Sequence, residues 1–198
     1  MKECDPPQRI PRITGEERTE AVWEIIQIFS GPDRLNVDEN HVLNTLGQHP
    51  ELAKPFLTFN RYLLMSSTLP VRLRQIAILR VCWIRKAPYM WSSHLRTSLR
   101  NGLSGEDFEP VKTGPDSPYW NGEEQAVLAA TDQLVVTSDL DDDSWKKLSA
   151  FLDRRQIIDF LFTVGTYVSL ALVLNAIRVE REPELLLLAE QYGAPAVT

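Results

Sequence analysis

The stretch from Leu69 to His94 constrains the fold of this chain more than any other part of the sequence. Apolar residues recur along it at helical spacing, and the pair Ala87-Pro88 interrupts the pattern. Proline is tolerated in the first turn of a helix, so the interruption predicts that one helix ends there and another begins. We therefore expect a helical hairpin whose second helix carries a histidine in its first turns.

The rest of the sequence also predicts helices, because helical periodicity dominates and alternating strand patterns are scarce. Capping residues, prolines and glycines divide the chain, and Ser67 or Thr68 is expected to cap the long helix of the hairpin. The fold class is all-α, with roughly eight to ten helices in a single domain over residues 1–198, of which 1–13 form an extended arm. The expected helices cover about 14–29, 40–47, 50–65, 68–86, 89–100, 104–110, 121–136, 141–151, 154–178 and 182–192.

Composition excludes several classes of protein. The net charge of −6 over 198 residues disfavours nucleic acid as a partner, since binding to phosphates needs clustered Lys and Arg. A basic strip on the first hairpin helix, between Arg72 and Lys86, is interpreted as a solvated or intersubunit face. Cys4 and Cys82 are the only cysteines, and no apolar signal core follows Met1. These features predict a cytoplasmic protein without disulfides.

One apolar segment, Ile157 to Ile177, approaches the length of a membrane span. Polar residues such as Asp159 and Asn175 interrupt it, which favours the central helix of a bundle or an oligomer interface over a membrane helix. We therefore expect no membrane partner.

Metal and cofactor motifs are weak in this sequence. His41, His49 and His94 lack the spacing of metal ligands, and the acidic run 139–143 lacks the glycine and the final glutamate of a calcium loop. No glycine-rich phosphate loop is present. We expect neither a metal nor a cofactor.

The hairpin resembles the active-site hairpin of the carboxymuconolactone decarboxylase and alkylhydroperoxidase-D (AhpD) superfamily. The peroxidase branch of that family has Glu, then Cys-x-x-Cys, then His, and the same spacing falls here on Gln75, Ala87, Met90 and His94. A methyl group and a thioether supply no thiolate nucleophile and form no disulfide. The resemblance thus implies an AhpD-like helical bundle in which thiol peroxidase activity is excluded.

The branch without cysteines often shows Tyr-Glu-Trp followed by His, and this chain has Tyr89-Met90-Trp91 followed by His94. The resemblance covers most of the chain from Ile10 to Pro183. Two acids of the family pattern are lost, at Gln75 and Met90. An acid elsewhere, such as Asp38 or Glu39, is a candidate replacement.

The resemblance assigns roles to the residues that remain. His94 is the expected acid or base, Tyr89 or Tyr167 a hydrogen-bond donor to a developing oxyanion, and Gln75 a group that orients His94 or a water. A dry, aromatic pocket is expected around them. The residues expected to bind substrate there are Trp91, Met90, Trp83, Tyr167 and Asn175, with Phe162 beside them.

Two functions follow from these residues. The first is a cofactor-free lyase, isomerase or cyclisation-type enzyme of secondary metabolism, acting on a small organic acid, lactone or enolisable aromatic compound. The alternative is a catalytically degenerate binding or scaffold protein. In both cases the resemblance implies a homo-oligomer, a trimer or a hexamer, with a dimer as a further option.

Overall fold

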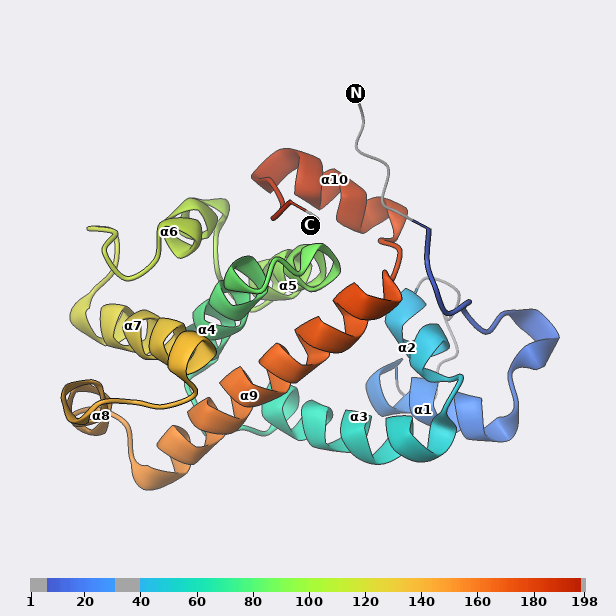
Figure 1. The fold of residues 1–198 in the computed structure, drawn as a ribbon, viewed down its shortest axis with the longest axis horizontal. Helices are drawn as coiled ribbons and strands as arrows, with labels where there is room; N and C mark the ends of the chain where they lie inside the picture. The colour runs from blue at the N-terminus through green and yellow to red at the C-terminus, as the bar shows by residue number, and fades with distance from the viewer. Residues whose placement is uncertain (1–6, 31–39, 197–198) are drawn as a thin grey trace.

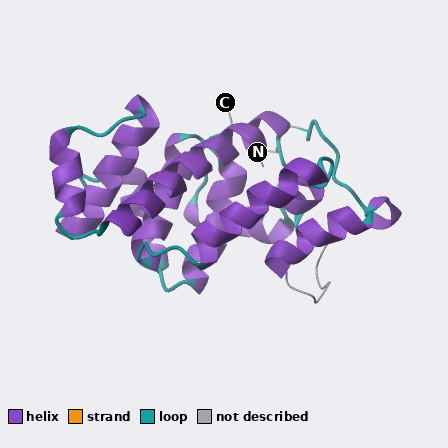
Figure 2. Ribbon diagram, turned by 90° about the horizontal axis from the view of Figure 1, so that it is seen from below, coloured by secondary structure: helices purple, strands orange, loops and turns teal. Residues whose placement is uncertain are grey.

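A computed structural model describes residues 7–30 and 40–196 of the chain. The described residues form helices and loops with no strand, which confirms the all-α fold (Figure 2). The α-helices are α1 (Glu20–Ser30), α2 (His41–Leu46), α3 (Pro50–Met65), α4 (Val71–Ile84), α5 (Pro88–Arg100), α6 (Phe108–Thr113), α7 (Gly122–Thr137), α8 (Asp142–Ser149), α9 (Arg154–Ile177) and α10 (Pro183–Tyr192). Two short 3-10 helices, η1 (Gly15–Glu17) and η3 (Gly105–Asp107), complete them.

Two predicted helix starts lie elsewhere in the structure. The cap at Thr14 opens only η1, and α1 begins five residues later, at Glu20. Ser67 and Thr68 do not cap α4, whose N-cap residue is Pro70. Their hydroxyl groups instead donate hydrogen bonds to the carboxylate of Asp159 on α9, so a tertiary contact replaces the local cap.

Helix α4 lies at the centre of the molecule and packs against α5, α6, α7 and α9 (Figure 1). Its residues from Ile76 to Leu79 are all fully buried, because neighbouring helices cover it on every side. Four consecutive apolar residues cover every side of one helical turn, and such a turn is expected where a helix is surrounded by others. The largest hydrophobic cluster of the described chain is built around it.

A second hydrophobic cluster joins the amino-terminal helices α1, α2 and α3. Ile25, Ile26 and Leu57 are among its buried members. In Figure 1 these helices lie at one end of α9, away from α6, α7 and α8 at the other. Phe56 packs against both clusters, so α3 connects the two parts of the core.

The apolar helix α9 is, by length and composition, long enough to cross a membrane. Over half of its most apolar window is buried inside the protein, and it contacts α3, α4, α5, α7 and α8. These contacts are typical of the core helix of a soluble helical protein.

The turn between α4 and α5 has a specific hydrogen-bond pattern. Lys86 adopts a left-handed conformation with φ 48°, its N–H donates to Trp83 O at 3.1 Å, and the N–H of Ala87 donates to Cys82 O at 2.9 Å. These two bonds form a Schellman motif, which ends α4 within one residue. Pro88 then begins α5, and this sharp turn confirms the predicted hairpin.

Candidate active site

One face of α5 forms a wall of a partly open cavity of about 190 Å³. Tyr89, Met90, Ser93, His94 and Thr97 recur on this face at helical spacing. Helices α1, α2, α3 and α9 supply the other walls, so the cavity lies where the two hydrophobic clusters meet. Most of these other walls are apolar side chains, as is usual for a pocket that binds a small molecule.

His94 and Tyr167 face each other across the junction of α5 and α9. Their ring centroids are 4.9 Å apart and the rings meet edge to face. His94 Nδ1 and Tyr167 Oη are completely buried and have no hydrogen-bond partner within the described part of the chain. An unpaired buried polar atom is costly, so such a pair at a cavity indicates a place where a ligand supplies the missing partners.

The environment of His94 keeps its imidazole neutral. Burial lowers its pKa to about 3, and the positive charges of Arg96 and Arg74 add to this effect. Arg96 lines the cavity and donates a hydrogen bond to Glu184 at 3.0 Å. Arg74 is 4% exposed and lies one helix away, on α4. This value lies well below that of an unperturbed histidine, which titrates near neutral pH.

Tyr89 belongs to a buried pair with Glu182. The Tyr89 hydroxyl donates a 2.8 Å hydrogen bond to Glu182 Oε1, which also accepts from the backbone N–H of His41 at 2.9 Å. Burial, the charge of Glu182 and this hydrogen bond raise the pKa of Tyr89 well above its ordinary range. The phenol therefore keeps its proton, and that proton points to Glu182.

The structure brings together four of the predicted site residues: Tyr89, Met90, His94 and Tyr167 line one cavity. Gln75 lies outside it, because its Oε1 accepts a hydrogen bond from Ser98 at 3.0 Å on the side of α5 that faces α4. The expected hydrogen bond from Gln75 to His94 is therefore absent. Gln75 holds the two hairpin helices together.

The two tryptophans also lie outside the cavity. Trp91 points to the other side of α5, where its Nε1 donates to Gly193 O at 2.7 Å and its ring lies 5.1 Å from that of Trp83. Lys112 Nζ stands 5.3 Å from the centroid of the Trp83 ring. The aromatic pair thus fixes α4 and α5 to α10 and α6 instead of lining a substrate pocket.

Asn175 and Phe162 on α9 also lie outside the cavity and make contacts elsewhere in the fold. The Asn175 amide donates to the carbonyls of Arg85 and Lys86, both at 3.1 Å, and so supports the hairpin turn. Phe162 is 56% exposed and meets only Phe59 in an edge-to-face contact at 5.7 Å among the aromatic pairs of the described residues. Neither side chain lines the cavity.

Three polar residues of this region were missed at the level of the sequence: Asn60, Arg96 and Glu182. Asn60 lines the cavity from α3, and its Oδ1 is buried without a partner. Glu182 comes from the loop before α10, 93 residues from Tyr89 in the chain. Its position as the residue before a helix-starting proline was visible, but nothing in the sequence linked it to Tyr89. Asp38 and Glu39, the acids that the sequence suggested, lie outside the described residues.

Thiol chemistry finds no support in the described residues. The thiol of Cys82 is fully buried in α4, and burial raises its pKa well above the ordinary range. Ala87 and Met90 occupy the positions at which the peroxidase branch has cysteines. The described ranges also contain no cluster of three or more His, Cys, Asp or Glu side chains suited to a metal ion.

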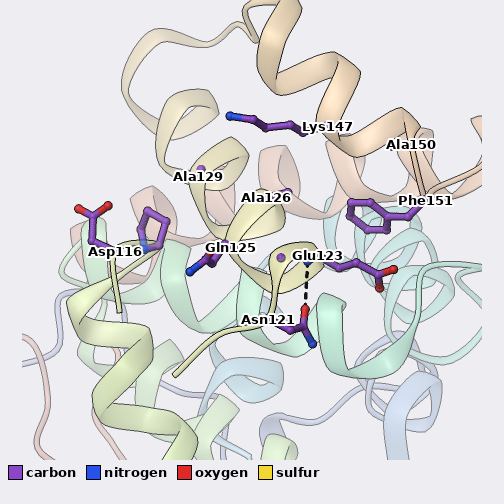
Figure 3. Close-up of a pocket in the computed structure, with 11 residues that line it drawn as sticks. Asp116, Asn121, Glu123, Gln125, Ala126, Ala129, Lys147, Ala150 and Phe151 are labelled. Atoms are coloured by element: carbon purple, nitrogen blue, oxygen red, sulfur yellow. Dashed lines mark hydrogen bonds between the residues drawn. The ribbon is translucent and has the colours of Figure 1, made fainter. Parts of the chain in front are cut away.

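A second depression, of about 930 Å³, lies between α7 and α8 (Figure 3). Two of its polar side chains have partners: Asn121 caps α7 by accepting hydrogen bonds from the backbone N–H groups of Glu123 and Glu124, and Lys147 pairs with Asp143 at 2.7 Å. None of the unpartnered buried atoms of the described chain lies there. The cavity beside His94 is therefore the better candidate for an active site.

The fold and the hairpin cavity define an AhpD-like helical protein, and comparison with known proteins agrees. The model of the carboxymuconolactone decarboxylase family matches residues 50–133, from the start of α3 into α7. Over these residues, which make up less than half of the chain, the sequence is similar to the carboxymuconolactone decarboxylase family, and the fold of the chain is AhpD-like. The residues at the cysteine and glutamate positions of the family pattern differ from that pattern. No curated protein matches the chain significantly.

Solved structures share the fold at low sequence identity. An AhpD-type protein of unknown function from Agrobacterium tumefaciens is 21% identical, with a TM-score of 0.65 over 70% of this chain and 95% of that one. The debrominase Bmp8, solved with 2,3,4-tribromopyrrole, is 14% identical, with a TM-score of 0.78 over 96% of this chain and all of that one. A peroxidase-related protein from Ralstonia eutropha is 14% identical, with a TM-score of 0.73 over 98% and 100% of the two chains.

Proposed function

We propose that this protein is a cofactor-free enzyme in which His94 transfers a proton within the α3–α5–α9 cavity. Its substrate is a small organic acid, lactone or enolisable aromatic metabolite, and the step is of the lyase, isomerase or cyclisation type. The observation that carries the proposal is the pair of buried, unpartnered atoms, His94 Nδ1 and Tyr167 Oη, on two residues that line one pocket. The similarity of residues 50–133 to a decarboxylase family supports it.

The charges around His94 favour a substrate that is or becomes an anion. In the empty cavity, burial and the charges of Arg96 and Arg74 lower the pKa of His94 to about 3, so the ring is neutral and its lone pair is free. A bound or developing anion offsets those charges and raises the pKa of His94 toward the range that suits a general base. Tyr167 then donates its unpaired O–H to the developing oxyanion.

The size of the cavity limits the substrate. A cavity of roughly 150 Å³ holds a benzene molecule in another protein. At about 190 Å³, the cavity of this chain has space for one ring with small substituents. The ligand in the structure of Bmp8, a bromopyrrole, is also a single ring, which supports a substrate of this size for this chain.

The alternative is a protein that binds a metabolite without converting it. It is favoured by the loss of both family acids, at Gln75 and Met90, and by the distance of the His94 pKa from neutrality. Such a protein keeps the cavity and loses only the proton transfer.

Hydrogen–deuterium exchange separates the two functions. Cyclohexanone and γ-butyrolactone in D₂O report any base that removes a proton next to a carbonyl group. We expect the protein to accelerate exchange, and His94→Gln to reduce the acceleration by about 10²–10⁴-fold. His49→Gln, at an exposed histidine, is the matched control and leaves the rate unchanged. Binding of both probes without exchange supports the alternative.

A further inference from the structure

We propose that Arg96 binds the carboxylate of a single-ring ligand in the cavity, and that this carboxylate replaces Glu184 on the guanidinium group. The inference rests on the proposed function and narrows its substrate to a ring that carries a carboxylate. It concerns binding and not the proton transfer at His94. Arg96 is then a substrate-binding residue, and Glu184 on α10 is its internal competitor.

Two neighbouring rows of side chains on α5 line the cavity. The first row is Tyr89, Ser93 and Arg96, and the second, one residue further along the helix, is Met90, His94 and Thr97. Intervals of four and three residues place the members of a row on one stripe of a helix. Arg96 therefore lies in the row beside that of His94. One ligand can place its carboxylate on Arg96 and its ring next to His94.

Arg96 gives the cavity a positive charge. It is the one charged side chain among the described residues that line the cavity, and none of these residues is Asp or Glu. Its charge acts on the site, because it contributes to the lowered pKa of His94. A cleft lined by charge of one sign attracts ligands of the opposite sign. An anion is therefore favoured over a neutral ligand of the same shape.

Arg96 also keeps donors available for a ligand. A guanidinium group has five N–H donors. Within the described part of the chain Arg96 donates one side-chain hydrogen bond, from Nη1 to Glu184 Oε2 at 3.0 Å. Its other N–H groups can hold a carboxylate through two parallel bonds. The hydroxyl of Ser93 and the amide of Asn60, on α3, add uncharged donors to the lining.

The ion pair between Arg96 and Glu184 is of a kind that gives way to a ligand. The side chain of Arg96 is 25% exposed and that of Glu184 57% exposed. Exposed ion pairs contribute little to stability, because water screens the charges and two long side chains lose freedom. A ligand carboxylate forms the same ion pair and also buries an apolar ring, which makes it the stronger partner.

Three probes test the inference by calorimetric titration of the whole chain near neutral pH. Benzoate is a single ring with a carboxylate, benzamide has the same shape without the charge, and acetate has the carboxylate without the ring. We expect benzoate to bind more tightly than either of the others by about tenfold or more.

Two variants are expected to move the affinity for benzoate in opposite directions. Arg96→Gln removes the charge and should lower the benzoate-to-benzamide preference by about fivefold or more, while the affinity for benzamide stays within about twofold. Glu184→Gln keeps the shape but removes the competing charge, and should raise the affinity for benzoate by about two- to fivefold. General loosening of the structure weakens binding in both variants and so does not give this pattern.

The matched control is Arg100→Gln, which removes the same charge from an exposed residue of α5 outside the lining. It should leave the benzoate-to-benzamide preference within about twofold of wild type. A loss of preference as large as that of Arg96→Gln would show that the overall charge of the protein, and not Arg96, selects the anion.

Each remaining outcome also decides a point. Equal affinity for benzoate and benzamide, or no binding of benzoate, overturns the inference. Acetate that binds as tightly as benzoate overturns the role of the ring. An unchanged preference in Arg96→Gln whose circular dichroism shows a folded chain overturns the role of Arg96. Glu184→Gln decides the competition alone, and an affinity for benzoate that does not rise overturns it. The proposed function is judged separately, because cyclohexanone and γ-butyrolactone carry no carboxylate.

Discussion

His94 shows how strongly a single residue depends on its surroundings. A solvated imidazole titrates near 6.5, but burial inside the cavity and the charges of Arg96 and Arg74 bring the pKa of His94 to about 3. Its Nδ1 atom has no partner in the described part of the protein, and its ring rests on the edge of Tyr167. The pKa of His94 therefore depends on the charge of any ligand bound in the cavity.

The depressed pKa of His94 predicts a pH dependence of stability. Below about pH 6.5 the unfolded chain binds a proton at this residue, whereas the folded chain does not until about pH 3, so the free energy of unfolding falls as the pH falls through this window. Between pH 6.5 and 5 the loss from His94 is about 1.5 kcal/mol. Urea denaturation across this range measures it. His94→Gln is expected to remove this part of the slope and His49→Gln to keep it; equal slopes for wild type and His94→Gln would contradict the prediction.

At the scale of helices, buried polar contacts set how the elements meet. Asp159 on α9 accepts hydrogen bonds from the N–H and hydroxyl of Thr68, at 2.6 and 2.8 Å, and from Tyr62 and Ser67, which fixes the loop before α4. In the basic strip on α4, expected to be a solvated or intersubunit face, Lys86 is exposed but other members pair with acidic side chains of neighbouring helices. Arg80, for example, donates to both carboxylate oxygens of Asp132 on α7.

Removing the Asp159 charge is expected to loosen the α4–α9 contact. Asp159→Asn weakens several hydrogen bonds to a carboxylate at once and should lower the free energy of unfolding by about 2–3 kcal/mol at pH 7. Burial by itself raises the pKa of Asp159, but the hydrogen bonds from Thr68 and its neighbours outweigh burial and hold this pKa below its ordinary value. Its contribution is therefore present above about pH 4 and is lost as the pH falls below the folded pKa.

Chemical denaturation at pH 7 and near pH 3 checks this prediction, and the gap between wild type and Asp159→Asn should narrow at the lower pH. Asp116→Asn, at an exposed site, is the control and should stay within about 0.5 kcal/mol of wild type. A gap that widens on acidification would show that another group dominates.

At the scale of the whole molecule, α3 and α9 carry a face of exposed apolar side chains. Ile158, Phe162 and Leu172 of α9 are each more than half exposed, and Met65 of α3 is 65% exposed. The contact of Phe162 with Phe59 joins the two helices in this face. Exposed apolar patches of this kind commonly mark an interface, so we propose that copies of the chain associate through it.

If copies of the chain associate through this apolar face, a charged side chain placed in it should separate them. We expect light scattering to give a trimer, a hexamer or a dimer at micromolar concentration, and Phe162→Glu to shift it to the monomer. Val136→Glu, on the exposed surface of α7, is the matched control and should leave the oligomer intact. A monomeric wild-type protein would remove this proposal.

Much of the fold follows from local patterns. The helix from Pro50 to Met65, the break at Ala87-Pro88 and the helix start at Asn121 are all present in the structure. These features were predictable because periodicity, proline geometry and capping act over a few residues.

The candidate site was predictable only in part. Trp91 lies on the same helix as Tyr89 but points to the other side, where α10 and not a substrate meets it.

The sequence by itself determined the helices, the hairpin, the family resemblance and the absence of a thiol pair, since each depends on neighbouring residues. Only the tertiary structure decided which polar atoms meet in the cavity. It brought Glu182 to Tyr89 across 93 residues, turned Gln75 toward Ser98, and lowered the pKa of His94 to about 3. Burial and charge at a site are set by helices distant in the chain, so no local pattern carries them.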